Sequence, residues 1–199
     1  SFFTEDKRKI KNAYKKALKS FGEFDEKIKK GMLATDILDR KFNVIKKSNE
    51  PLLNILVIGH VYNLYDSFIN MDMIEKLRKK GAQITTIDMV EEDIIRKNAC
   101  TLPKRMFWNF GSRAFGSTMH FLEREDIDGI IYLMSFGCGI DSFVCDLIER
   151  KIRKTKDIPF IILTLDEHSG QAGMDTRLEA FIDMIRWRYR NEDNVSAYG

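Results

Sequence analysis

The chain has 199 residues and a mass of 23.2 kDa, which suits one ordinary domain with a helical extension and is too short for two full-sized domains. Hydrophobic residues make up 44% and charged residues 32%, so intrinsic disorder and low-complexity or fibrous classes are excluded. Charge is uneven: residues 1–50 contain 14 Lys and Arg against 8 Asp and Glu, whereas the remainder contains 19 against 22.

Three cysteines, an odd number in a chain with a good-sized core, indicate a reducing compartment and not a disulfide scaffold. The apolar runs fall well short of the roughly 18 residues that a membrane-spanning helix needs. Residues 1–6 lack the basic, apolar and small-residue regions of a secretion signal. We therefore expect a cytoplasmic protein with no membrane partner.

Residues 1–50 are expected to form a basic helical extension, with helices over 5–30 and 34–47. Apolar residues recur at steps of three and four in the first helix, at Ile10, Tyr14, Leu18 and Phe21. The lysines between them are then the solvated face of an amphipathic helix, and nucleic acid is not expected as a partner.

Strands and helices alternate after Pro51, and the pattern predicts one domain over residues 51–190 followed by a frayed tail at 191–199. Strands separated by helices pair in parallel through right-handed crossovers. The expected fold is a three-layer, Rossmann- or flavodoxin-like α/β domain with a four-stranded parallel sheet in the order 2-1-3-4. The predicted strands are 53–58, 83–88, 129–134 and 159–165, and the predicted helices are 67–80, 91–97, 105–124, 142–154 and 175–190.

The turn after the third strand is the strongest candidate site, because ligands of open parallel sheets bind outside the carboxyl ends of the strands. Gly137 and Gly139 flank Cys138, and Asp141 or Ser142 could cap the helix that follows. A thiol at a helix N-terminus is favoured as the thiolate, which attacks electrophiles and ligates metals. The alternative is a buried, structural thiol in a tight turn.

Further candidates follow the other strands. His60 follows the first strand, and Glu167 and His168 follow the fourth. His168 could be an acid–base group or could simply hydrogen-bond the loop backbone. Arg177 opens the last helix and could meet a carboxylate or a bound anion. Cys100 is a second candidate metal ligand in a loop at the same edge. Cys145 is expected to be structural, because its neighbours Phe143, Val144, Leu147 and Ile148 make that helix face look like core. The chain has no CxxC, HExxH or GxGxxG motif, so zinc and an ordinary dinucleotide are not expected.

Three segments resemble a known family. They are Gly59–Asp66 (GHVYNLYD), Ser135–Ser142 (SFGCGIDS) and Leu165–Phe181 (LDEHSGQAGMDTRLEAF). They are similar to the C-terminal part of 2-hydroxyacyl-CoA dehydratase-like proteins, especially those called CoA-substrate-specific enzyme activase-related. The resemblance covers roughly residues 50–190.

Members of this wider group carry an iron–sulfur cluster on cysteines between two Rossmann-like domains and receive electrons from an ATP-hydrolysing activator. The resemblance implies that Cys138 is one ligand of a 4Fe-4S cluster. It also implies that the other ligands belong to an N-terminal domain, for which Cys100 before Pro103 is a weak substitute. One thiolate cannot hold a cubane that needs three or four, so the isolated chain is expected to bind no cluster and to be inactive alone.

Three hypotheses follow. The first is a cluster-binding half-site in a dehydratase or reductase that acts on a CoA ester, with Gly137, Gly139, Asp141, Ser142 and Arg177 around the cofactor and His60, Glu167 and His168 on the substrate side. The second is a non-enzymatic, flavodoxin-like module that binds a CoA ester, nucleotide or phosphate, or docks a partner protein. The third is an enzyme with Cys138 as nucleophile and His168 as base.

Overall fold

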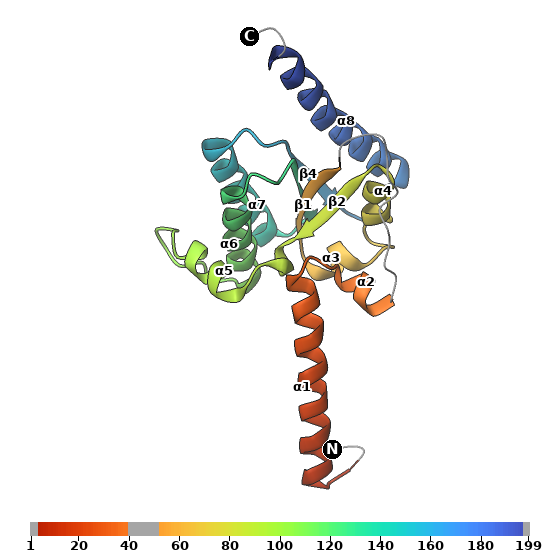
Figure 1. Ribbon diagram of the computed structural model, residues 1–199, viewed down its shortest axis with the longest axis vertical. Helices are drawn as coiled ribbons and strands as arrows, with labels where there is room; N and C mark the ends of the chain where they lie inside the picture. Colours follow the sequence, from red (N-terminus) through yellow and green to blue (C-terminus); the bar gives the residue numbers. More distant parts are fainter. Residues whose placement is uncertain (1–3, 40–51, 197–199) are drawn as a thin grey trace. The chain divides into compact units, whose positions relative to one another are not determined.

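Four parallel strands form the centre of the α/β domain in the computed structural model, which describes residues 4–39 and 52–196 (Figure 1). The chain divides into two units, residues 1–43 and 44–199. In the second unit the sheet order is β2-β1-β3-β4, and every pairing is parallel, as predicted. The strands are β1 (Leu53–Gly59), β2 (Ala82–Thr86), β3 (Gly129–Ser135) and β4 (Phe160–Leu165).

The two central strands are almost entirely buried, because helices cover both faces of the sheet. Figure 1 shows α5, α6 and α7 on one face and α4 and α8 on the other, so the predicted three layers are confirmed. The helices of this unit are α3 (Val61–Tyr65), α4 (Met73–Lys79), α5 (Glu92–Ala99), α6 (Asn109–Glu123), α7 (Gly139–Thr155) and α8 (Gln171–Ser196), with a 3₁₀ turn, η1 (Ile87–Met89).

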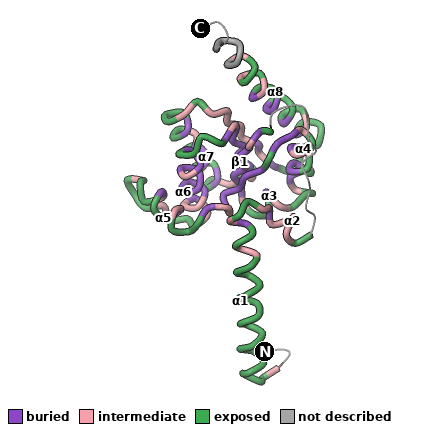
Figure 2. Tube along the Cα trace, in the orientation of Figure 1, coloured by how far each residue is buried: buried purple, intermediate pink, exposed green. Residues whose placement is uncertain are grey.

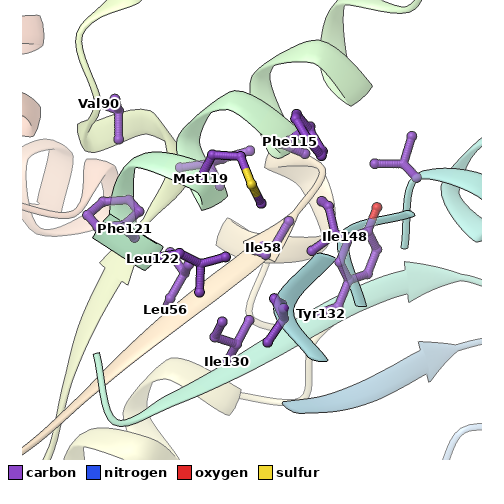
Figure 3. Close-up of a cluster of buried hydrophobic side chains, with 14 of the residues drawn as sticks. Leu56, Ile58, Val90, Phe115, Met119, Phe121, Leu122, Ile130, Tyr132 and Ile148 are labelled. Atoms are coloured by element: carbon purple, nitrogen blue, oxygen red, sulfur yellow. The ribbon is translucent and has the colours of Figure 1, made fainter. Parts of the chain in front are cut away.

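The core lies between the sheet and these helices, and Figure 2 shows buried residues concentrated there. On the α5–α7 face, Leu56 and Ile58 of β1 and Ile130 of β3 pack with side chains of α6 and α7 (Figure 3). Gly116 allows α5 and α6 to approach closely, since a Cβ there would lie 2.3 Å from the Ile95 carbonyl oxygen.

The predicted helix over 67–80 is wrong in its first half. The Asp66 carboxylate accepts hydrogen bonds from the amides of Phe68 and Ile69, which closes a local turn. Met71 and Asp72 then take positive φ angles of 55° and 58°, so the helix restarts only at α4. A short helix, α3, precedes this turn and was not predicted.

Other boundaries moved by a few residues. The second strand ends at Thr86 and continues as η1, α6 begins at Asn109, and α8 extends over 171–196 instead of 175–190. The helix after β3 begins at Gly139 and not at residue 142.

The N-terminal unit contains α1 (Lys7–Lys29) and α2 (Ala34–Asp39). The Asp6 carboxylate accepts hydrogen bonds from the amides of Arg8 and Lys9 and so caps α1. The helix ends before Gly31, whose φ is +92°. The rest of the predicted helix over 34–47 lies outside the described residues.

Candidate functional site

The turns after β1, β3 and β4 meet at the carboxyl edge of the sheet. The Asn63 side-chain amide donates to the Ser135 hydroxyl at 2.9 Å, which joins the first two turns. The amide of Phe136 donates to the Leu165 carbonyl at 2.9 Å, which joins the turn after β3 to the end of β4. Three segments that lie far apart in the sequence therefore form one continuous edge.

Cys138 lies at the N-cap of α7, in the turn directly after β3. Its amide donates to the Ser135 carbonyl at 3.2 Å, and its own carbonyl accepts the first helical bond from Ser142 at 3.0 Å. Gly137 has a φ of +74°, a conformation that glycine adopts without strain. Gly139 has an ordinary φ, and a Cβ there would meet nothing within 4 Å. The cysteine is half-buried between two exposed glycines.

Asp141 and Ser142 do not cap α7, because the helix starts before them. Both lie in its first turn, and no side chain caps the helix at Cys138. The Ser142 hydroxyl donates to the Cys138 carbonyl at 3.1 Å. The Asp141 carboxylate is fully buried and turns back to β3, where it accepts a hydrogen bond from the Ser135 amide at 3.2 Å. The carboxylate therefore closes the loop that carries the cysteine.

Tyr132, in the middle of β3, completes this buried arrangement. Its hydroxyl donates to Asp141 Oδ1 at 3.1 Å, and the side chain is fully buried. Burial is the largest cause of a raised pKa for Tyr132, and the nearby Asp141 carboxylate and the Cys145 and Cys138 thiols raise it further. The hydroxyl thus stays protonated and remains a donor to the carboxylate.

His60 contacts the same carboxylate from the turn after β1. Its Nε2 atom lies 3.5 Å from Asp141 Oδ1, and 24% of its side chain is exposed. The imidazole stacks on Phe110 of α6 at a centroid distance of 3.7 Å and on Tyr62 at 5.2 Å. The sequence predicts His60 at this edge but does not identify Asp141 or Phe110 as its neighbours.

The loop between β4 and α8 holds the remaining candidates. The Ser169 hydroxyl donates to the Asp166 carboxylate at 2.8 Å, and this bond is the main cause of a lowered pKa for Asp166. Glu167 and His168 are strongly exposed and lie 3.7 Å from each other. Beside this loop is an open cleft of about 400 Å³. It is lined by residues that include Thr164, Asp166, His168, Ser169, Gly173 and Arg177.

The other two cysteines differ sharply from Cys138. Cys100 is exposed at the C-terminal cap of α5. Cys145 is buried on the inner face of α7, and burial raises the pKa of its thiol to about 12. Within residues 4–39 and 52–196, no group of three or more His, Cys, Asp or Glu side chains could hold a metal ion. Cys138 is therefore not part of a group of three or more such side chains within these residues.

An exposed aromatic rim runs along the edge next to the cysteine turn. The Trp108 and Phe143 rings meet edge to face at a centroid distance of 6.1 Å, and Phe107 packs against Trp108. Phe143 looked like a core residue in the sequence, yet it is 55% exposed. We define the aromatic rim as Tyr62, Phe107, Trp108, Phe136, Ile140 and Phe143, all exposed.

The fold defines a Rossmann-like α/β domain, and the candidate turns lie at the carboxyl edge of its sheet. Residues 77–185 match the family described as 2-hydroxyglutaryl-CoA dehydratase, D-component, and residues 1–90 match the CoA enzyme activase uncharacterised domain. The chain belongs to the 2-hydroxyglutaryl-CoA dehydratase D-component family, which confirms the resemblance to dehydratase-like, activase-related proteins. No curated protein matches the sequence.

The two matched regions share one sheet. The first includes β1 and β2, the second includes β2, β3 and β4, and β1 pairs in parallel with both β2 and β3. Among the described residues, no helix is long and apolar enough to cross a membrane.

Proposed function

We propose that this domain provides one side of an iron–sulfur cluster site in a 2-hydroxyacyl-CoA dehydratase-like protein, with Cys138 as its ligand. The observation that supports the proposal is the Cys138 turn, which presents a half-buried thiol at the N-terminus of α7 and at the carboxyl edge of the sheet. A cluster bound there would supply low-potential electron transfer, driven by an activator that hydrolyses ATP.

The residues around the thiol suit this role. The first amides of α7 have no partner inside the helix, so they can hydrogen-bond sulfur next to Cys138. The absence of a side chain at Gly139 leaves open space beside the cysteine. Neither packing nor backbone conformation requires a glycine at this position. Asp141 is too deeply buried to contact a cofactor, and we assign it to holding the turn.

The site is proposed to be completed by another domain of the same protein. One thiolate cannot hold a cluster alone, and the described residues offer no further set of ligands beside it. The aromatic rim would be covered by such a domain, since exposed aromatic side chains that contact one another are typical of an interface. A domain that brings the remaining ligands to Cys138 must also approach this rim.

The substrate side is proposed to lie between His60 and the cleft beside β4. Arg177 would bind an anionic part of the CoA ester, and Glu167 and His168 would contact the ligand from the exposed loop. The hydrogen bond between Phe136 and Leu165 brings this loop next to the cysteine turn.

The test is the iron and sulfide content, after anaerobic purification, of the intact protein, by which we mean this chain together with the domain proposed to complete the site. We expect wild-type protein to be brown and Cys138→Ala to lose most of its iron. Cys145→Ala is the matched control and should keep its iron, because the buried Cys145 thiol lies on the inner face of α7. Loss of iron from Cys100→Ala would identify a second ligand. An iron-free, colourless wild-type protein refutes the proposal.

The cleft favours a second candidate function, a module that binds a CoA ester, nucleotide or phosphate without iron. Its volume of about 400 Å³ and the guanidinium of Arg177 suit an anionic ligand. In that case coenzyme A should raise the melting temperature equally in wild-type protein and Cys138→Ala, and Arg177→Gln should abolish the effect. A melting temperature that does not respond to coenzyme A excludes this candidate.

A further inference from the structure

We propose that His60 and Asp141 form an acid–base dyad, in which the buried carboxylate holds Nε2–H of the imidazole and Nδ1 is the atom that exchanges protons beside the cysteine turn. The inference rests on the proposed function for the identity of the substrate, but the dyad itself requires no cluster. Asp141 acts as a positioning residue, and His60 is the group that would touch the substrate.

The carboxylate is surrounded by donors. Oδ1 accepts from the Tyr132 hydroxyl at 3.1 Å and lies 3.5 Å from His60 Nε2, and Oδ2 accepts from the Ser135 amide at 3.2 Å. Asp141 has no exposed surface. The Tyr132 hydroxyl and the Ser135 amide both donate to this carboxylate, so it is held as an acceptor. An imidazole nitrogen that faces an acceptor is favoured in its protonated form, which assigns the proton of His60 to Nε2.

The buried negative charge of Asp141 is the second argument for a role of His60. Tyr132 and the Ser135 amide are neutral donors, and the raised pKa of Tyr132 keeps its hydroxyl protonated. A buried negative charge is costly unless an opposite charge can balance it. A proton accepted at Nδ1 would convert His60 to the imidazolium, which Asp141 balances, and the same proton would be returned from Nδ1 in the next step.

The plane of the ring is restrained. Phe110 from α6 and Tyr62 from α3 stack on the imidazole, so the ring cannot tilt away from Asp141 without breaking two ring contacts. The titratable groups around the imidazole are Asp141 of α7, which also accepts from Tyr132 of β3, and Tyr62 of α3, the helix that begins after His60. A quarter of the side chain remains exposed, which leaves a route for protons to the edge of the sheet.

Nuclear magnetic resonance of the ring nitrogens in the full 199-residue chain tests the dyad without iron. We expect a directly observed, slowly exchanging Nε2–H proton that is missing in His60→Gln, whereas exposed His168 shows none. On acidification a second proton should appear on Nδ1 of His60 while Nε2–H persists. Asp141→Asn should speed the exchange of Nε2–H with water about tenfold, because a charge-assisted bond is lost.

Asp146→Asn is the matched control. It removes an exposed carboxylate of the same helix, which pairs with Arg150, and should leave the His60 signals unchanged. A neutral His60 with its proton on Nδ1, or an Nε2–H signal that Asp141→Asn does not alter, overturns the dyad. If Asp141→Asn does not fold, the nitrogen that carries the proton in wild-type protein decides the question. An iron-free parent protein would refute the proposed function and leave this result standing.

Discussion

The side-chain amide of Asn63 donates a hydrogen bond to the hydroxyl of Ser135 at 2.9 Å, which ties the turn after β1 to the last residue of β3. Asn63 is buried, so its amide has no access to water as a substitute partner. The two ends of the candidate site are thus held together by a bond that both turns share.

Asn63→Ala should lower the free energy of unfolding by about 1–2 kcal/mol, because it removes this bond and leaves the half-buried Ser135 hydroxyl without its donor. Urea denaturation measures the change. Asn109→Ala, at an exposed position at the start of α6, is the control and should change stability by less than about 0.5 kcal/mol. Equal effects of the two substitutions would show that the turns are not coupled through Asn63.

Gly116→Ala should destabilise the domain by about 3 kcal/mol, because the new Cβ would meet the backbone of α5 at Ile95. Gly173→Ala is the matched control within a helix, where a Cβ meets nothing within 4 Å. It should be neutral or stabilise by up to about 1 kcal/mol through the higher helix propensity of alanine. Thermal unfolding of the two variants gives the comparison, and a harmless Gly116→Ala would rule out this helix contact.

The two glycines beside Cys138 should behave differently. Gly137→Ala should cost about 1–2 kcal/mol of stability, because the φ of +74° is unfavourable for alanine. Gly139→Val should fold with nearly unchanged stability, yet it should reduce the iron content of the intact protein by filling the space beside the thiol. Full iron loading in a folded Gly139→Val protein would mean that this space has no role in the site.

The raised pKa of Cys145 predicts that the protein loses stability at alkaline pH. Its thiol has an ordinary pKa of 9.0 when exposed, and burial raises the pKa to about 12 in the folded protein. The unfolded chain therefore releases a proton that the folded protein keeps, so the stabilisation is fully present below pH 9.0 and is lost as pH rises towards 12.

The expected loss from this thiol approaches about 1.4 kcal/mol per pH unit in that range. Urea denaturation between pH 9 and 11 should show a shallower dependence for Cys145→Ala than for wild-type protein. Cys100→Ala removes an exposed thiol and should leave the dependence unchanged. Tyr132 adds a loss of the same sign, because its pKa is also raised.

The sheet could be predicted because its signals are local. The run Leu53–Ile58 is β-branched and ends at a glycine, and each strand is followed by a helical pattern, which determines parallel pairing. The helix over 67–80 could not be predicted correctly, since the side chain of Asp66 competes for the local amides and stops the helix. Apolar periodicity does not report that competition.

The position of the site was predictable for the same reason, because strand ends in a parallel sheet share one edge. The neighbours of each side chain were not. Tyr132 looks like any aromatic residue of a buried strand, and only the packing of β3 against α7 shows that its hydroxyl meets Asp141. The available signal was the hydroxyl of Tyr132, because a polar group on a buried strand residue needs a hydrogen-bond partner. The opposite error occurs at Phe143. Its sequence pattern predicts a core residue, but the side chain is exposed in the aromatic rim.

The central claim is that Cys138 binds iron, and electron paramagnetic resonance of the reduced, anaerobically purified intact protein tests it most directly. Serine in place of cysteine changes the ligand atom from sulfur to oxygen at one iron. We predict that Cys138→Ser either loses the cluster or keeps it with a shifted spectrum and an altered reduction potential. A Cys138→Ser protein with the same spectrum, potential and iron content as wild-type protein would contradict the assignment.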